Sequence, residues 1–376
     1  MCRLAPLLLG AFVLVAGVSV YEPSAQTARN EVGIKTERPI LALAIKGSDV
    51  AWLTSNEYST GGIESLSLWL QTSGKTAQLS WPKGVRFDTY FGAADLSIAR
   101  GNVGWVVATH EGNYGETVYG ASSARTGKAT LFGTNYDDGS FPTPGGGKFL
   151  TNVTASGDEI LWGTATVAVR DTAEAGLAEC DLWAGEGCKT RILGGAINRW
   201  VGDESKRIKG LPPSAALAAD GKLIALAIWP RGPWVKGGYP PLGAIRVSTL
   251  GGRVLTRIKP PRVVRDEPVG MEMAFSQRLL ALHVVKAVAL YAVPSGRFLR
   301  RVHLLVGEEA FAVTRKKLVL WNEHRLLVVD SRSGRHKRIS VSGATTITAV
   351  ATDGDRLAWA QTNNQGQSNV RIIHVG

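Results

Sequence analysis

The segment Thr352-Asp-Gly-Asp-Arg-Leu-Ala-Trp359 decides the fold, because its pattern recurs along the whole chain. In each copy a small or apolar lead-in precedes a tight polar turn, and a short run of alternating apolar residues follows. A two-residue turn between such alternations predicts a β-hairpin. The turns of the seven copies begin at Lys46, Arg100, Ser156, Asp220, Ser276, Thr314 and Asp353.

The spacing of these copies predicts the architecture. Successive copies lie roughly 40 to 60 residues apart, a period typical of arrays of supersecondary units. Four strands with their turns need roughly 40 residues, so the shortest periods hold one four-stranded unit and the longer ones carry loop insertions. No window shows the sustained apolar spacing of a helix. We therefore expect an all-β chain that forms a seven-bladed β-propeller of four-stranded antiparallel blades.

Residues 1–28 differ in kind from the rest of the chain. Arg3 supplies a positive charge, residues 6–20 form an almost uninterrupted apolar run, and small residues follow. This pattern predicts a signal peptide, with an uncleaved N-terminal anchor as the alternative because the run approaches the roughly 18 residues that span a bilayer. Under either interpretation, residues 29–376 form a single propeller domain that is secreted or held at the cell envelope.

Export affects the expected oxidation state of the cysteines. Beyond the leader only Cys180 and Cys188 remain. In an oxidising compartment, two cysteines around a short glycine-containing loop predict a disulfide that stiffens the loop locally. A metal site is the alternative, although no third and fourth ligand with suitable spacing is nearby. The chain has no P-loop, dinucleotide fingerprint, nucleophile elbow or zinc motif, so we expect no cofactor and no metal.

A second turn recurs in the other half of each unit, as at Ser333-Gly-Arg335. The basic residue that follows the glycine begins an outer strand, where charge discourages edge pairing. Together the two turns resemble the repeats of bacterial exported β-propellers of the WD40-like and TolB-like type, over residues 39–376. The resemblance implies the propeller fold. The resemblance does not indicate which function the protein has, because such folds serve as binding scaffolds and as enzymes.

Ring closure is expected to involve the N-terminal segment. The last copy ends in a third strand at residues 369–375, and no fourth strand follows it. An open ring would expose a sheet edge. The strand-like run at residues 31–36 precedes the first copy, and we expect it to supply the missing outer strand of the last blade.

Long loops are expected on one face of the ring. The turns from first to second strand and from third to fourth strand share one face, and all long insertions fall on the other, where rigid scaffolds often carry function. The insertion at 229–241 is rich in rigid aromatic and basic side chains, which suit contact with a partner or alternatively cap a blade. The candidate binding residues are Trp229, Arg231, Trp234, Lys236 and Tyr239 in this insertion, and Tyr114, Tyr136 and Asp137 in two earlier ones.

The formal net charge of +12 limits the chemical classes of partner that the chain can attract. Outside the membrane it favours an acidic protein or an anionic envelope polymer, with carbohydrate as a further possibility and no nucleic acid. The basic residues are spread along the chain, which is typical of a solvated rim. We expect a monomeric, non-enzymatic binding scaffold, and the alternative is a hydrolase, lyase or lactonase at the central channel. An enzyme would gather carboxylates or histidines at the channel mouth, whereas a scaffold would show aromatic residues and scattered charge.

Overall fold

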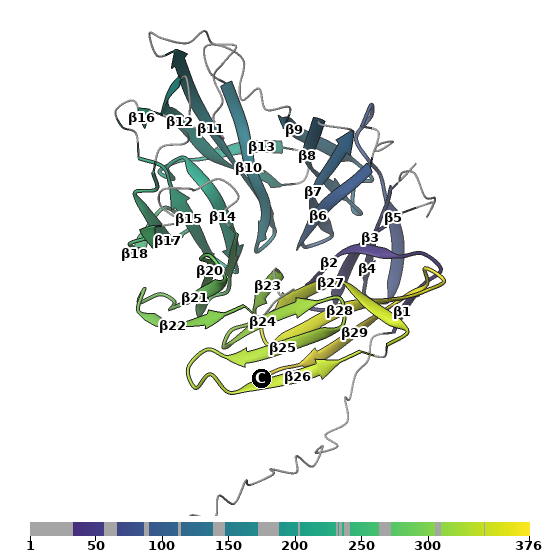
Figure 1. The fold of residues 1–376 in the computed structure, drawn as a ribbon. Helices are drawn as coiled ribbons and strands as arrows, with labels where there is room; N and C mark the ends of the chain where they lie inside the picture. Colours follow the sequence, from purple (N-terminus) through teal and green to yellow (C-terminus); the bar gives the residue numbers. More distant parts are fainter. Residues whose placement is uncertain are drawn as a thin grey trace, which may run out of the picture.

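The computed structural model contains seven antiparallel sheets arranged as a ring, which confirms the predicted seven-bladed β-propeller (Figure 1). The sheets are numbered here as blades one to seven in chain order. Described residues are 33–55, 66–85, 90–111, 114–137, 147–171, 188–201, 204–230, 232, 235–236, 241–262, 272–304, 310–341 and 343–376.

Each blade has four main strands. Blade one holds β2 (Ile40–Lys46), β3 (Asp49–Ser55), β4 (Leu66–Thr72) and β5 (Lys75–Leu79). Blade two holds β6 (Tyr90–Ala99), β7 (Asn102–Glu111), β8 (Tyr114–Ser123) and β9 (Ala129–Asp137). Blade three holds β10 (Gly147–Ser156), β11 (Glu159–Asp171), β12 (Cys188–Val201) and β13 (Glu204–Ile208). Blade four holds β14 (Ser214–Asp220), β15 (Leu223–Ile228), β17 (Ala244–Thr249) and β18 (Val254–Ile258).

The remaining blades complete the ring. Blade five holds β19 (Met273–Phe275), β20 (Leu279–His283), β21 (Ala287–Ala292) and β22 (Phe298–His303). Blade six holds β23 (Ala310–Val313), β24 (Lys317–Asn322), β25 (Arg325–Asp330) and β26 (His336–Ser340). Blade seven holds β27 (Thr345–Asp353), β28 (Arg356–Asn363), β29 (Ser368–His374) and β1 (Ile34–Thr36).

The N-terminal strand closes the ring as predicted. Strand β1 pairs antiparallel with β29, so that Ile34 lies opposite Val370. Figure 1 shows β1 beside the yellow strands of blade seven. The buried side chain of Ile34 belongs to an apolar cluster that joins blade one to blade seven. The two ends of the described chain therefore meet in one sheet.

The recurring turn has two chemistries. In five copies the turn residue is a glycine with positive φ, between 52° at Gly47 and 74° at Gly101. Blades five and six lack this glycine, and a hydroxyl orders the turn instead. The Ser276 Oγ accepts a hydrogen bond from the backbone nitrogen of Leu279 at 3.0 Å, and the Thr314 Oγ1 accepts one from Lys317 at 3.1 Å. Serine and threonine form such turns through their own side chains, so the motif keeps its shape without glycine.

The core is a ring of apolar clusters rather than one centre. Clusters lie between neighbouring blades, and the second strand of each blade contributes strongly because both its faces are covered. Trp105 in β7 is fully buried and donates a hydrogen bond from Nε1 to the Ser122 hydroxyl at 3.1 Å. Its ring meets Trp81 edge-on with centroids 5.0 Å apart. Stability therefore depends on contacts between adjacent blades.

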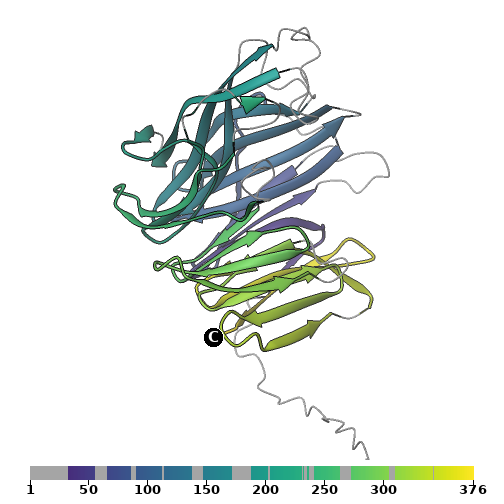
Figure 2. The same ribbon diagram turned by 60° about the vertical axis from the view of Figure 1, so that its left-hand side comes forward.

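Blades two and three are the largest. Strands β11 and β12 have 13 and 14 residues, whereas β20 in blade five has 5. The long blue and teal strands stand out beside the shorter green and yellow ones in Figure 2. Part of the predicted loop at 229–241 is a short strand, β16 (Val235–Lys236), which pairs with β12. The insertions of the long repeats therefore extend sheets as well as forming connections.

The predicted leader at residues 1–28 lies outside the described residues. Within the part of the chain that the structure describes, no helix has the length and apolar character needed to cross a bilayer.

Candidate ligand site in the central channel

The first strands of the seven blades surround a central channel. A cavity of about 450 Å³ is lined by β2, β6, β10, β14, β19, β23 and β27. Its wall is built largely of small side chains, which keep the centre open where larger ones would fill it. These residues include Ala42, Ala44, Ala94, Ala155, Ala219, Ala274, Ala312, Ala349 and Ala351.

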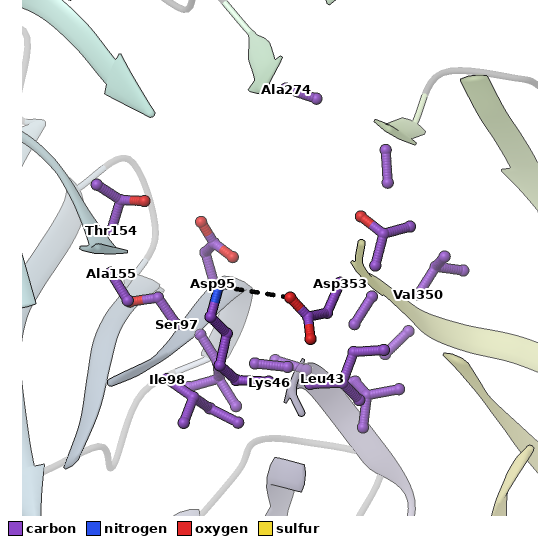
Figure 3. Close-up of a pocket in the computed structure, with 18 of the residues that line it drawn as sticks. Leu43, Lys46, Asp95, Ser97, Ile98, Thr154, Ala155, Ala274, Val350 and Asp353 are labelled. Carbon is purple, nitrogen blue, oxygen red and sulfur yellow. Dashed lines mark ion pairs between the residues drawn. The ribbon is translucent and has the colours of Figure 1, made fainter. Parts of the chain in front are cut away.

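The first strands run from the face of the long insertions, called here the loop side, to the face of the recurring short turns, called the turn side. A salt-bridge network spans the turn-side end of the channel. The Lys46 ammonium lies 3.3 Å from Oδ1 of Asp220 and 3.4 Å from Oδ1 of Asp353. Figure 3 shows Lys46 and Asp353 projecting from the wall toward each other. Because these residues come from blades one, four and seven, the network braces the ring across its centre.

The charge of Lys46 is stabilised in this position. Burial alone would lower the pKa of Lys46, but attraction to Asp353 and Asp220, together with their hydrogen bonds, outweighs it and raises that pKa. Both carboxylates also accept backbone hydrogen bonds, Asp353 from Gly47 at 2.7 Å and Asp220 from Gln277 at 3.1 Å. These charges are thus paired and held by neighbouring blades, which is the arrangement of a structural ion cluster.

The loop-side mouth of the channel has a different character. A cavity of about 420 Å³ lies there, with Asp95 from β6 and Glu272 before β19 in its wall. Phe311 in β23 and Trp321 in β24 line the same cavity. Aromatic faces and carboxylates therefore share one opening, contributed by blades two, five and six.

Asp95 is the most unusual ionisable group of this mouth. Its side chain is exposed to solvent, yet the channel wall surrounds it. This surrounding protein disfavours the charged form and raises the pKa of Asp95 to about 6, partly offset by a hydrogen bond from the Leu96 backbone. Among the described residues no lysine, arginine or histidine lies within salt-bridge distance of this carboxylate. Figure 3 shows Asp95 projecting into the opening.

The other wall of the mouth carries Glu272, and His283 lies beside it. The Nδ1 of His283 lies 3.6 Å from Oε2 of Glu272, and the imidazole ring meets Phe311 with centroids 6.2 Å apart. Within the described residues, histidine, cysteine and carboxylate side chains form no group of three that could hold a metal ion. Carboxylates beside aromatic faces can bind a cationic group through charge and cation–π attraction together.

The structure describes the backbone of five of the eight predicted binding residues. Trp229 is 2% exposed and packs in an apolar cluster of blades three, four and five, which is the setting of a residue that caps a blade, the alternative role predicted for it. Its contact with a partner stays a prediction. Its large ring covers core that would otherwise meet water. Lys236 lies in β16, opposite Lys189 of β12.

Three further candidates meet at one end of blade two. Tyr114 begins β8, and Tyr136 and Asp137 end β9, which pairs with β8 through Glu116 and Gly115. The backbone thus places them at the same end of blade two, on the loop side. Arg231, Trp234 and Tyr239 lie outside the described residues. The predicted disulfide also falls there, because Cys180 is outside them while Cys188 begins β12.

The residues of the channel were missed in the sequence, although signals for them exist. Lys46, Asp220 and Asp353 occupy the same position of the recurring motif, immediately before the turn glycine. One lysine and two aspartates at equivalent positions of a ring can meet at its centre. Asp95 interrupts an otherwise small and apolar inner strand, and a lone carboxylate on such a strand must point into the channel or be buried.

Comparison with known proteins adds little to this description. No protein-family model matches the sequence, and no curated protein matches it. Among solved structures, the crystal structure of Saccharomyces cerevisiae Sqt1 aligns over 93% of this chain and 100% of its own, with a TM-score of 0.42 and 11% identity. A likeness this distant says nothing about function. The assignment as a seven-bladed β-propeller rests on the chain's own sheet topology.

Proposed function

We propose that this protein is an exported, monomeric, non-enzymatic recognition propeller that binds a protein partner at the cell envelope through the loop-side mouth of its channel. The observation that carries the proposal is the exposed carboxylate of Asp95, which faces an opening lined by Phe311 and Trp321. Central openings on the loop side of a rigid ring are favourable places for recognition.

The chemistry of the mouth defines the group it would take. Asp95 and Glu272 make the opening acidic although the chain as a whole is basic. A lysine or arginine side chain of the partner would pair with Asp95 and lie against the aromatic faces. This differs from the anionic partner that net charge alone favours, because local charge and not the total decides what enters a narrow opening.

The energetics of Asp95 support a binding role. A charged group that is surrounded by protein without a cationic partner makes the folded state less stable. Residues that destabilise the folded protein and make no compensating contact within it are concentrated at functional sites. The paired charges at the turn side show that this fold can satisfy its channel carboxylates with a lysine. Asp95 is therefore well suited to receive its cation from outside.

A hydrolase or lyase activity is the second candidate, and the same mouth supplies its support. The pKa of Asp95, about 6, lies near the range in which a carboxyl group can act as a general acid. Glu272 in the wall of this mouth, with His283 beside it, offers a second ionisable pair. Turnover of ester or glycoside substrates that is lost in Asp95→Asn would favour the enzyme over the scaffold.

The binding proposal is tested with a fluorescent lysine-rich peptide titrated against the full chain. Asp95→Asn and Trp321→Ala should each weaken binding about tenfold, since a desolvated ion pair or cation–π contact contributes on the order of 1–2 kcal/mol. Acetylation of the peptide lysines should have a similar effect. The matched control is Asp158→Asn, an exposed aspartate that pairs with Arg100 on the turn side. Equal affinity for the acetylated peptide, or equal loss in the control, would refute the proposed role of the mouth.

The exported location needs its own test. A reporter fused after residue 28 should leave the cytoplasm, and peptide mapping of the exported chain without reduction should join Cys180 to Cys188. Retention of the reporter in the cytoplasm would remove the cell envelope from the proposal. Two free thiols in exported protein would remove the inferred disulfide.

A further inference from the structure

A second feature lies on the turn side, between blades five and six, at the opposite face of the ring from the mouth. A groove of about 670 Å³ is lined by the turns of these two blades. Five exposed cations line it, all carried by turns or by the strand that begins after one. They are Arg278, Arg297, Arg315, Lys316 and Arg332.

The positive charge of this groove is largely uncompensated. Asp330 is the one acidic residue among the described residues of its lining, and its Oδ1 accepts hydrogen bonds from Ser333 N at 2.7 Å, Ser333 Oγ at 2.8 Å and Arg332 N at 3.1 Å. Those bonds hold the turn. Arg315 has Asp355 at 3.9 Å, the outer limit of a salt bridge. Within the described chain the other four cations have no carboxylate within salt-bridge distance.

The backbone beneath these cations is held firmly. The nitrogen of Ser331 donates to the Lys316 carbonyl at 2.9 Å, which joins the two turns of blade six. The nitrogen of Val293 donates to the Arg278 carbonyl at 2.9 Å, which joins those of blade five. Arg300 then links the blades, because its Nε donates to the Ser331 carbonyl at 3.1 Å and its Nη2 to the Arg332 carbonyl. The cations therefore stand on a preorganised framework, which lowers the entropy cost of binding.

The groove continues outward past the turn of blade five. A second cavity of about 410 Å³ is lined by Arg297, Phe298, Leu299, Ser331 and Arg332, so two of the cations belong to both cavities. The cationic surface is thus elongated, which suits a chain of charges better than a single ion.

We propose that this groove binds a linear phosphate polymer without bases. Four of the five cations are arginines, whose planar forks hydrogen-bond two phosphate oxygens at once. Like charges that face one groove repel each other in the unliganded protein, and a polyanion removes that repulsion. Phe298, 53% exposed, is the only large exposed apolar side chain in the described lining. Proteins that bind single-stranded nucleic acid use a series of stacking aromatic rings, so one phenylalanine favours a base-free chain.

The probe is long-chain inorganic polyphosphate, titrated against the full chain at low salt. The double variant Arg297→Gln/Arg332→Gln should bind it about tenfold or more weakly, and its affinity should depend less steeply on salt because fewer phosphates are contacted. Within the part of the chain that the structure describes, neither side chain makes a hydrogen bond or salt bridge, so the fold should be retained. The matched control, Lys75→Gln/Lys222→Gln, removes two exposed turn-side charges from blades one and four and should bind as the parent does.

Two further probes test the chemistry of the ligand. Polyglutamate of similar charge should bind at least about tenfold more weakly, since carboxylates on flexible side chains match the groove less well. A single-stranded oligonucleotide should also bind more weakly than polyphosphate. Equal affinity for polyglutamate, tighter binding of the oligonucleotide, or equal loss in the control variant would each overturn the proposal. None of these results depends on a cation at the loop-side mouth.

Discussion

The two ends of the channel use carboxylates in opposite ways. At the turn side, Asp220 and Asp353 share the ammonium of Lys46 and accept backbone hydrogen bonds from neighbouring blades. At the loop side, Asp95 faces the opening with no cationic partner among the described residues, and burial raises its pKa to about 6. Both ends belong to the same seven strands, so the difference lies in the side chains and not in the scaffold.

The turn-side end of the channel therefore has a structural role, and the loop-side end is suited to binding. Charges that satisfy one another across a ring stabilise it, whereas a charge left without a partner lowers stability and stays available to a ligand. Variants at the turn side should therefore destabilise the protein, and a neutral residue at the mouth should stabilise it.

The largest effect is expected where the ring closes. Ile34→Asp should lower the free energy of unfolding by roughly 3 kcal/mol or more, because it places a carboxylate in the apolar cluster between blades one and seven. Loss of this seam would also separate Lys46 from Asp353. Thermal unfolding measures the effect, and Lys35→Asp, on the exposed side of the same strand, is the control. Equal melting temperatures for the Ile34 variant and the parent would show that β1 does not hold the ring closed.

An intermediate effect is expected at the turn-side network. Lys46→Met leaves Asp220 and Asp353 without their shared cation, and should lower the free energy of unfolding by about 1–2 kcal/mol at pH 7, between the values typical of exposed and buried pairs. Because folding raises the pKa of Lys46, its stabilisation is complete below the unfolded value of 10.5 and is lost as pH rises through the folded pKa. Urea unfolding at neutral and strongly alkaline pH should show the gap between parent and variant shrinking. A gap that persists undiminished would assign the effect to packing.

The fold could be predicted from the sequence because the turn motif repeats. Gly47 and Gly354 mark hairpins whose chemistry is local, and an array of hairpins at that period allows few architectures. Ring closure was predictable for the same reason, since a blade of three strands requires a fourth. The insertions carry no such repetition, which is why β16 was not expected and why the sequence left two roles open for Trp229, which is buried.

The candidate sites were beyond local reasoning because they are assembled by the ring. Lys46 and Asp220 are 174 positions apart in the chain, and only closure of the blades brings them together. The basic groove likewise combines turns of two blades whose cations, taken singly, indicate only a solvated rim. Asp95 was the one group whose position within an inner strand could have identified the mouth.

The smallest effect is expected at Asp95, and its sign is opposite to that at Lys46. Folding raises the pKa of Asp95 from 3.8 to about 6, so the folded protein retains a proton that the unfolded chain has lost between these values. Stability therefore falls as pH rises from about 4 to about 6, and the cost is present in full above that range. Asp95→Asn removes the cost and should stabilise the protein at pH 7 by about 1 kcal/mol, a figure reduced because the side chain is exposed. Near pH 4 the variant and the parent should be equally stable. Urea unfolding at pH 4 and pH 7 measures this, and a variant less stable than the parent at pH 7 would mean that the Asp95 carboxylate is a structural group like those at the turn side.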